Sequence, residues 1–176
     1  MHALDQFRNG LDRALDALSP PTKVYAHCDI PCGIYDPHEA QISALTVLRM
    51  DQLIAELKAP ASDAKPEERA AYVHKLQRYT SVKETHAERV KHEVRVIWGD
   101  YFTADMLKAN PGVSDLVLRI LKCASKARQE PGLPAAEELL GCVQEFAEIF
   151  WKTKGTATAK LPSHQKSGGT LVVPTS

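Results

Sequence analysis

The chain has 176 residues and no long apolar run. No stretch approaches the roughly 18 consecutive apolar residues that would span a bilayer. Residues 1–26 carry acids and arginines where a secretory leader needs a continuous apolar core. Net charge is also absent, since 22 Lys and Arg balance 22 Asp and Glu. Proteins that bind nucleic acid or anionic membranes have clustered basic residues, so we expect neither partner and a cytoplasmic location.

Cysteine is scarce, but its placement is informative. Four cysteines are too few and too irregularly spaced to predict a disulfide scaffold. Two of them, Cys28 and Cys32, follow His27 directly in the segment HCDIPCGIYDP (27–37). Thiolates are soft metal ligands, and a His followed by a Cys offers an imidazole, a sulfur and the intervening backbone nitrogen to one ion. The segment therefore predicts a metal site, although a lone C-x3-C pair is a weak indication of zinc.

Helical periodicity dominates the remaining sequence, and no convincing strand appears in the body of the chain. The segment Asp36-Pro37-His38-Glu39 is typical of a helix start, with a capping acid and an early proline. We expect an amphipathic leader helix over 2–18 and four further helices over about 38–58, 67–98, 114–129 and 134–154. Four amphipathic helices with short Pro- and Gly-containing turns predict an all-α fold, an antiparallel four-helix bundle. Residues 155–176 are mostly polar and are expected to form a flexible tail.

The segment 27–37 resembles the metal hook of the nickel-containing superoxide dismutases. Two further segments resemble helices of that family, KHEVRVIWGDYF (91–102) and IFWKTK (149–154). The resemblance covers about residues 27–154 and implies a four-helix bundle preceded by an N-terminal hook. It also implies an antioxidant oxidoreductase with one nickel per subunit, assembled as a homohexamer. The implied reaction disproportionates superoxide to oxygen and hydrogen peroxide while nickel cycles between its divalent and trivalent states.

The resemblance also implies the metal ligands. They are the α-amine and imidazole of His27, the amide nitrogen and thiolate of Cys28, and the thiolate of Cys32. In the family the hook stands at the mature N-terminus, so residues 1–26 are expected to be a leader. A maturation protease would cut between Ala26 and His27, because a peptide bond from Ala26 turns the required amine into a poorly donating amide.

Four hook and gate residues receive roles from the same resemblance. Tyr35 corresponds to a gate that orders water and keeps small anions near the metal, in contact with a second tyrosine that corresponds to Tyr101. Asp29 corresponds to an acid that helps to hold the loop. Pro31 corresponds to a cis proline that folds the loop so that the two sulfurs converge.

The sequence departs from the family pattern where the axial imidazole is oriented. Family members use a glutamate and an arginine at positions that correspond to Ser43 and His86 here. We hypothesise that His86 replaces this pair as the partner of His27, because a metal-bound imidazole usually has an outer hydrogen-bond partner. A solvent-facing helix histidine is an equally good interpretation of His86.

Two other functions stay open at this point. A non-enzymatic helical bundle could carry nickel or zinc on the same ligands without turnover. A purely helical interaction module with incidental cysteines would be unaffected by changing Cys28 and Cys32 to serine.

Overall fold

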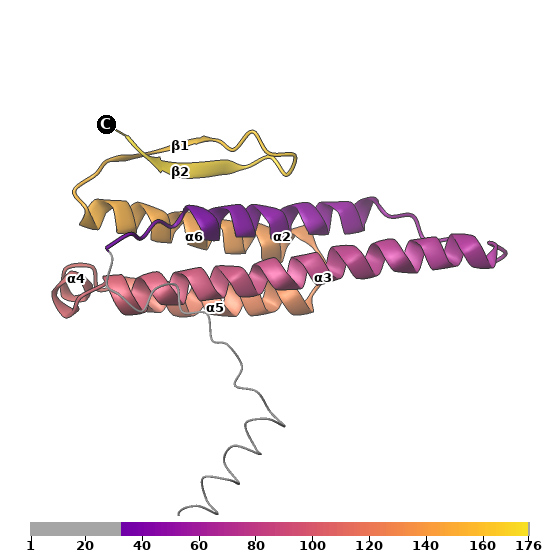
Figure 1. Ribbon diagram of the computed structural model, residues 1–176, viewed down its shortest axis with the longest axis horizontal. Coiled ribbons are helices and arrows are strands. Elements are labelled where there is room, and N and C mark those ends of the chain that lie inside the picture. The colour runs from indigo at the N-terminus through magenta and orange to yellow at the C-terminus, as the bar shows by residue number, and fades with distance from the viewer. Residues whose placement is uncertain (1–32, 176) are drawn as a thin grey trace, which may run out of the picture. The chain divides into compact units, whose positions relative to one another are not determined.

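Long helices account for most of residues 33–175, the part of the chain that this computed structural model describes (Figure 1). They are α2 (His38–Glu56), α3 (Pro66–Val96), α5 (Val113–Gln129) and α6 (Leu133–Thr153). A π-helical turn, η1 (Ile97–Tyr101), and a short helix, α4 (Ala104–Ala109), connect α3 to α5. The four helices predicted over residues 38–154 are thus confirmed within a few residues at each end.

The helix boundaries follow from local chemistry. At the start of α2 the carboxylate of Asp36 accepts a hydrogen bond from the backbone N–H of His38 at 2.8 Å, which satisfies one of the amides that the first turn leaves unpaired. Pro66 opens α3, where its missing N–H has no cost. Gly132 precedes α6 with a φ of +130°, a conformation that glycine adopts readily.

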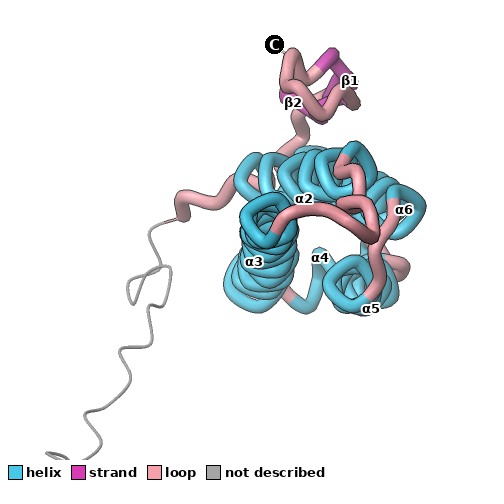
Figure 2. The backbone as a smooth tube through the Cα atoms, turned by 90° about the vertical axis from the view of Figure 1, so that its right-hand side faces the viewer, coloured by secondary structure: helices cyan, strands magenta, loops and turns pink. Residues whose placement is uncertain are grey.

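The four long helices form the predicted bundle. Viewed end-on, they occupy the corners of a square in the order α2, α3, α5 and α6 (Figure 2), and each helix contacts its neighbours in that order. Apolar side chains from all four fill the interior, with Phe146, Phe150, Ile120 and Leu139 fully buried. Burying one such side chain stabilises a fold by about 1.5–3 kcal/mol, so this shared core holds the helices together.

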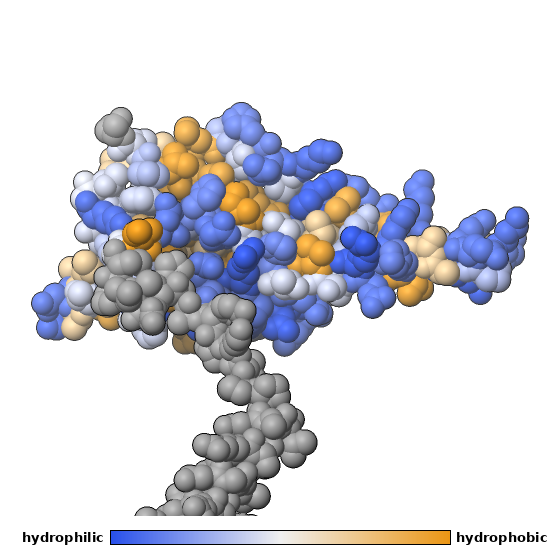
Figure 3. All heavy atoms as spheres, in the orientation of Figure 1, coloured by the Kyte–Doolittle hydropathy of each residue, from blue (hydrophilic) through white to orange (hydrophobic). Residues whose placement is uncertain are grey.

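Helix α3 extends beyond the other helices (Figure 1). Its first half, residues 66–82, contains no buried residue, whereas Lys83, Ala87, Val90 and Val94 in its second half are buried. The projecting end is mostly hydrophilic on its surface (Figure 3). Only the second half of α3 therefore belongs to the bundle core.

Residues beyond α6 form a β-hairpin, so the predicted flexible tail over 155–176 is wrong for this segment. Strands β1 (Thr158–Pro162) and β2 (Thr170–Pro174) pair antiparallel, with Lys160 opposite Val172. Val172 is 2% exposed, and hydrogen bonds from helix side chains hold the strand. A polar composition failed to predict this order because the segment is held by hydrogen bonds to the bundle and by packing against it, and not by a core of its own.

The predictions for residues 1–32 lie outside the described residues. They comprise the leader, the cleavage point after Ala26, and five hook residues. These five are His27, Cys28, Asp29, Pro31 and Cys32. In the part of the chain that the structure does describe, no helix is long and apolar enough to cross a membrane.

Candidate functional site

Two predicted site residues, Tyr35 and Tyr101, meet at the end of the bundle where α2 begins. Tyr35 precedes α2, and Tyr101 is the last residue of η1. Their ring centroids lie 5.7 Å apart with the planes tilted by 52°, a separation at which aromatic rings attract one another. The fold thus brings together two tyrosines that are far apart in the sequence, as the resemblance implied.

The core fixes the position of Tyr101. Its ring lies 4.8 Å from that of Phe150 on α6 and 5.4 Å, edge to face, from that of Phe102. Both phenylalanines are buried, whereas Tyr101 is half-buried. One face of Tyr101 is therefore anchored in the bundle, and the rest of the side chain reaches its surface.

The hydroxyl of Tyr101 has a defined hydrogen-bond direction. It lies 2.8 Å from Oγ1 of Thr153. Thr153 donates its only hydroxyl hydrogen to the backbone carbonyl of Phe150 at 2.6 Å, so it must act as the acceptor for Tyr101. The Tyr101 proton therefore points toward α6, and the lone pairs of its oxygen stay available to accept a hydrogen bond.

A lysine adds positive charge beside this tyrosine. Nζ of Lys154 lies 4.9 Å from the ring centroid of Phe150, 5.5 Å from that of Tyr101 and 5.6 Å from that of Trp151. A cation at these distances is attracted to the ring faces. Lys154 is itself exposed, so its charge also faces solvent, where it favours the approach of a small anion.

Thr153 and Lys154 received no role from the sequence. Both belong to the segment 149–154, which was matched to the family's last helix without any residue being assigned a function. The available signal was their position at the end of the helix, two to four residues after Phe150 and Trp151. Only the fold reveals that this helix end reaches Tyr101.

The predicted partners of the axial imidazole have different environments. Ser43 is buried on α2. Nδ1 of His86 lies 2.9 Å from the carbonyl oxygen of Val82 in its own helix. A carbonyl only accepts, so Nδ1 is the donor in this contact. Within the described residues no hydrogen bond joins His86 to Ser43, and the proposed link to His27 stays a prediction.

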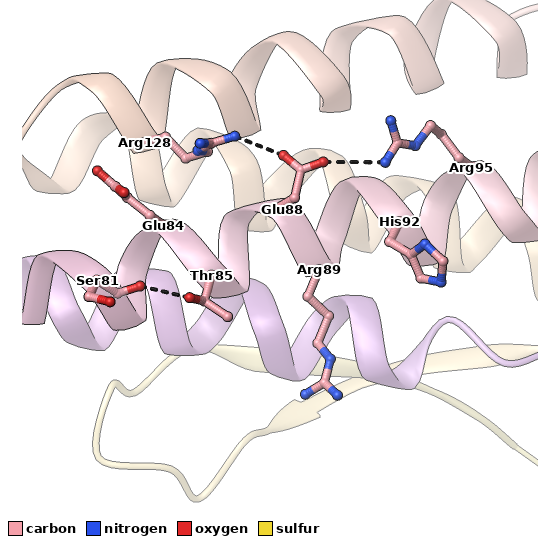
Figure 4. A pocket seen from close by; sticks show the side chains of 8 residues that line it. All are labelled: Ser81, Glu84, Thr85, Glu88, Arg89, His92, Arg95 and Arg128. Carbon is pink, nitrogen blue, oxygen red and sulfur yellow. Dashed lines mark hydrogen bonds and ion pairs between the residues drawn. The ribbon is translucent and has the colours of Figure 1, made fainter. Parts of the chain in front are cut away.

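A separate groove of about 680 Å³ runs along α3 and α5 (Figure 4). Its centre is Glu88, which pairs with Arg128 at 2.8 Å and with Arg95 at 3.3 Å. The carboxylate thus compensates two of the cations in the groove. None of the tyrosine-site residues lines it. Among residues 33–175 no three His, Cys, Asp or Glu side chains converge closely enough to hold a metal ion.

Comparison with known proteins gives a consistent result. The family model described as nickel-containing superoxide dismutase matches residues 22–154. The superoxide dismutases [Ni] of Streptomyces seoulensis and Streptomyces coelicolor are each 34% identical over 136 residues, which is 77% of this chain and 94% of theirs. A native nickel superoxide dismutase solved at 1.30 Å is 34% identical with a TM-score of 0.63, and covers 73% of this chain and 99% of its own. A structure with nickel ligation corresponding to the oxidised state gives 31% identity and a TM-score of 0.64 over the same shares.

Proposed function

Because the chain belongs to the nickel-containing superoxide dismutase family, it is a superoxide dismutase with nickel as its cofactor, and we propose that residues 27–32 hold this metal. The observation that carries the proposal is the contact between Tyr35 and Tyr101. Tyr35 lies three residues beyond the last proposed thiolate, Cys32, and the contact adds the second half-buried, hydroxyl-bearing ring of Tyr101.

The proposed donors suit nickel chemically. His27 supplies an α-amine and an imidazole, Cys28 an amide nitrogen and a thiolate, and Cys32 a second thiolate. Thiolates stabilise a higher oxidation state of the metal. When bound, nickel supplies a one-electron couple between its divalent and trivalent states, through which one superoxide is oxidised to oxygen and another is reduced to peroxide.

The described residues supply the surroundings of this chemistry. Lys154 places a positive charge beside the tyrosine pair, which favours the approach of the superoxide anion. The proton of Tyr101 points to Thr153, so we assign Tyr101 the role of accepting a hydrogen bond from ordered water or from peroxide. Tyr35 is then the residue of the pair that we assign to proton delivery and gating.

Other parts of the proposal follow from the family resemblance. Asp29 holds the hook, and Pro31 turns it so that the two thiolates converge. Where this sequence departs from the family pattern, at Ser43 and His86, we assign His86 as the partner that orients the imidazole of His27. The mature chain starts at His27 after proteolysis, works in the cytoplasm and assembles as a homohexamer.

The decisive experiment compares two purified proteins that differ by one residue, one starting at His27 and a matched control starting at Ala26. We expect about one nickel per chain and rapid superoxide decay, followed by pulse radiolysis, only for the protein that starts at His27. The control keeps every side chain but has no free amine on His27. Equal rates for the two proteins would refute the proposed donor set.

A second comparison separates an enzyme from a carrier. Changing both Cys28 and Cys32 to serine in the His27 protein should abolish nickel retention and superoxide decay together. Tightly bound nickel without accelerated superoxide decay in the unmodified protein would favour a metal carrier.

A further inference from the structure

The C-terminal hairpin is attached to α2 by a buried glutamine. Nε2 of Gln41 donates to the carbonyl oxygen of Val172 at 3.0 Å, and Oε1 of Gln41 accepts from the N–H of Val172 at 2.7 Å. One side chain thus makes the two hydrogen bonds that a residue of a neighbouring antiparallel strand would make. Gln41 is 1% exposed and Val172 2% exposed, so both bonds are shielded from water.

Two more glutamines hold the hairpin. Nε2 of Gln144 on α6 donates to the carbonyl oxygen of Thr170 at 2.7 Å, and Nε2 of Gln52 on α2 donates to that of Ser167 at 2.9 Å. The hairpin is therefore fastened to two neighbouring helices, beside which it lies in Figure 2.

Close packing accompanies these hydrogen bonds. Gly169, at the end of the hairpin loop, has a φ of +75°. A Cβ atom added there would lie 3.2 Å from a methyl carbon of Leu45 on α2 and 3.3 Å from one of Leu140 on α6. The backbone thus approaches both helices as closely as a residue without a side chain allows. The hairpin is docked in the groove between α2 and α6.

Gln41 also belongs to the first turn of α2, which begins at His38, three residues after Tyr35. Its backbone N–H donates to the carbonyl oxygen of Pro37 at 3.1 Å, a bond that closes the first turn of α2. Asp36, next to Tyr35, accepts from the N–H of His38 in the same turn. A residue held by the hairpin is therefore hydrogen-bonded to the short segment that connects Tyr35 to α2.

We infer that the C-terminal hairpin is a positioning element for the superoxide site, which acts through Gln41 on the first turn of α2 and so on the contact between Tyr35 and Tyr101. The family match ends at residue 154, before β1 begins at Thr158, so this element lies outside the family model. The effect of the hairpin on catalysis rests on the proposed function. Its effect on the first turn of α2, called the coupling below, does not.

The coupling is tested on the nickel-free full-length protein by hydrogen exchange with mass spectrometry. We expect Gln41→Ala to accelerate exchange of amides in residues 33–42 by about fivefold or more, which corresponds to the loss of one or two net hydrogen bonds. The matched control is Gln52→Ala. It removes a hydrogen bond from the same helix to the same hairpin, about three helical turns away, and should leave residues 33–42 unchanged while β2 and its loop exchange faster.

A spectroscopic signature tests whether Tyr35 itself responds. The near-UV circular dichroism signal that Tyr35→Phe removes should shrink in Gln41→Ala and persist in Gln52→Ala. Removal of residues 155–176 should reproduce the effect of Gln41→Ala. If that truncated protein does not fold, the two point variants decide the question.

The outcomes separate this inference from the proposed function. Unchanged exchange of residues 33–42 in Gln41→Ala, or equal acceleration in both glutamine variants, would overturn the positioning role. If the coupling is present in a His27 protein that neither retains nickel nor removes superoxide, the positioning role stands and the proposed function fails. In an active protein, Gln41→Ala should lower the rate of superoxide decay more than Gln52→Ala does, with nickel content unchanged.

Discussion

The two ends of the bundle are held in different ways. Where α2 begins, Tyr101 packs against Tyr35 and Phe150. Near the other end of α2, an ion pair joins α2 to α3. Nζ of Lys83 lies 2.9 Å from Oδ1 of Asp51, and these side chains are 3% and 0% exposed. The beginning of α2 and Asp51 are separated by about 20 Å along the helix. One end of the bundle is held by half-buried rings and the other by fully buried charges.

The two kinds of attachment have different energetics. Ring contacts at the tyrosine end contribute about 0.5–1.5 kcal/mol each beyond burial, and both tyrosines are only half-buried. At the other end Lys83 also donates to the carbonyl oxygen of Glu130 at 3.0 Å. This one buried ammonium group therefore links α2, α3 and the α5–α6 connection. Among the described residues, Oδ2 of Asp51 has no hydrogen-bond partner. The stability of the fold is therefore sensitive to loss of the partner of Oδ1, Lys83. We therefore expect stability to depend more on the ionic end and activity more on the tyrosine end.

The largest expected effect comes from breaking the ion pair. Lys83→Met should reduce the free energy of unfolding by about 3–5 kcal/mol, because it leaves the carboxylate of Asp51 buried without its cation. Urea denaturation of the nickel-free protein measures the change. The superoxide rate per folded, nickel-loaded molecule should stay within about twofold of the unmodified protein.

The control for this variant removes both charges. Asp51→Leu combined with Lys83→Met should recover most of the lost stability, since a buried pair can often be replaced by apolar side chains at little cost. If the double variant is as unstable as Lys83→Met alone, the loss comes from packing and not from an isolated buried charge.

A smaller effect is expected at the tyrosine end. Thr153→Val removes the acceptor of the Tyr101 hydroxyl and should cost about 1 kcal/mol of stability, while Thr153→Ser should cost less because it keeps the oxygen. The Raman Fermi doublet of tyrosine, with Tyr101→Phe as the reference for assignment, reports whether the hydroxyl still donates. Superoxide decay should slow in the valine variant and recover in the serine variant. An unchanged doublet in Thr153→Val would contradict the hydrogen-bond direction derived for Tyr101.

The smallest effect is expected in the chemical reactivity of Cys123, in the middle of α5. This reactivity is used below to compare the two ends of the bundle. Burial raises the pKa of the Cys123 thiol to about 12, and the neighbouring Cys142 contributes to this rise. The raised pKa keeps the thiol protonated at pH 8, so the reactive thiolate is scarce in the native protein. Iodoacetamide should therefore leave Cys123 unmodified in the native protein and modify it in urea.

The same reagent ranks the two ends of the bundle. Lys83→Met should expose Cys123 through more frequent unfolding and increase its modification clearly above the native level. Thr153→Val should increase it only slightly. Equal modification in both variants would mean that the two ends contribute alike to the stability of the core.

Local signals in the sequence predicted the helices well. Asp36, Pro66 and Gly132 mark boundaries by backbone chemistry, which acts over a few residues and is legible without the fold. The contact of Tyr35 with Tyr101 was implied by the family resemblance, and Thr153 and Lys154 were missed because their partner belongs to a different helix.

Buried polar residues were the main structural features that the sequence did not reveal. Asp51 and Gln41 have polar side chains, which the sequence alone does not assign to the interior, yet both are 1% exposed. Their partners, Lys83 and Val172, lie 32 and 131 residues away. No local pattern indicates such pairings, because a polar side chain becomes favourable in the interior only when its partner is present. The hairpin was missed for the same reason.

The π-helical turn Ile97–Tyr101 has a consequence for sequence change. A turn closed by i→i+5 bonds contains one residue more than its α-helical equivalent, and each residue of an α-helix advances the side-chain direction by about 100°. Deletion of Gly99 would restore a regular helix and redirect every side chain that follows. Tyr101 would then lose its contact with Phe150. Insertions and deletions in this turn are therefore restricted to those that keep the direction of the Tyr101 side chain.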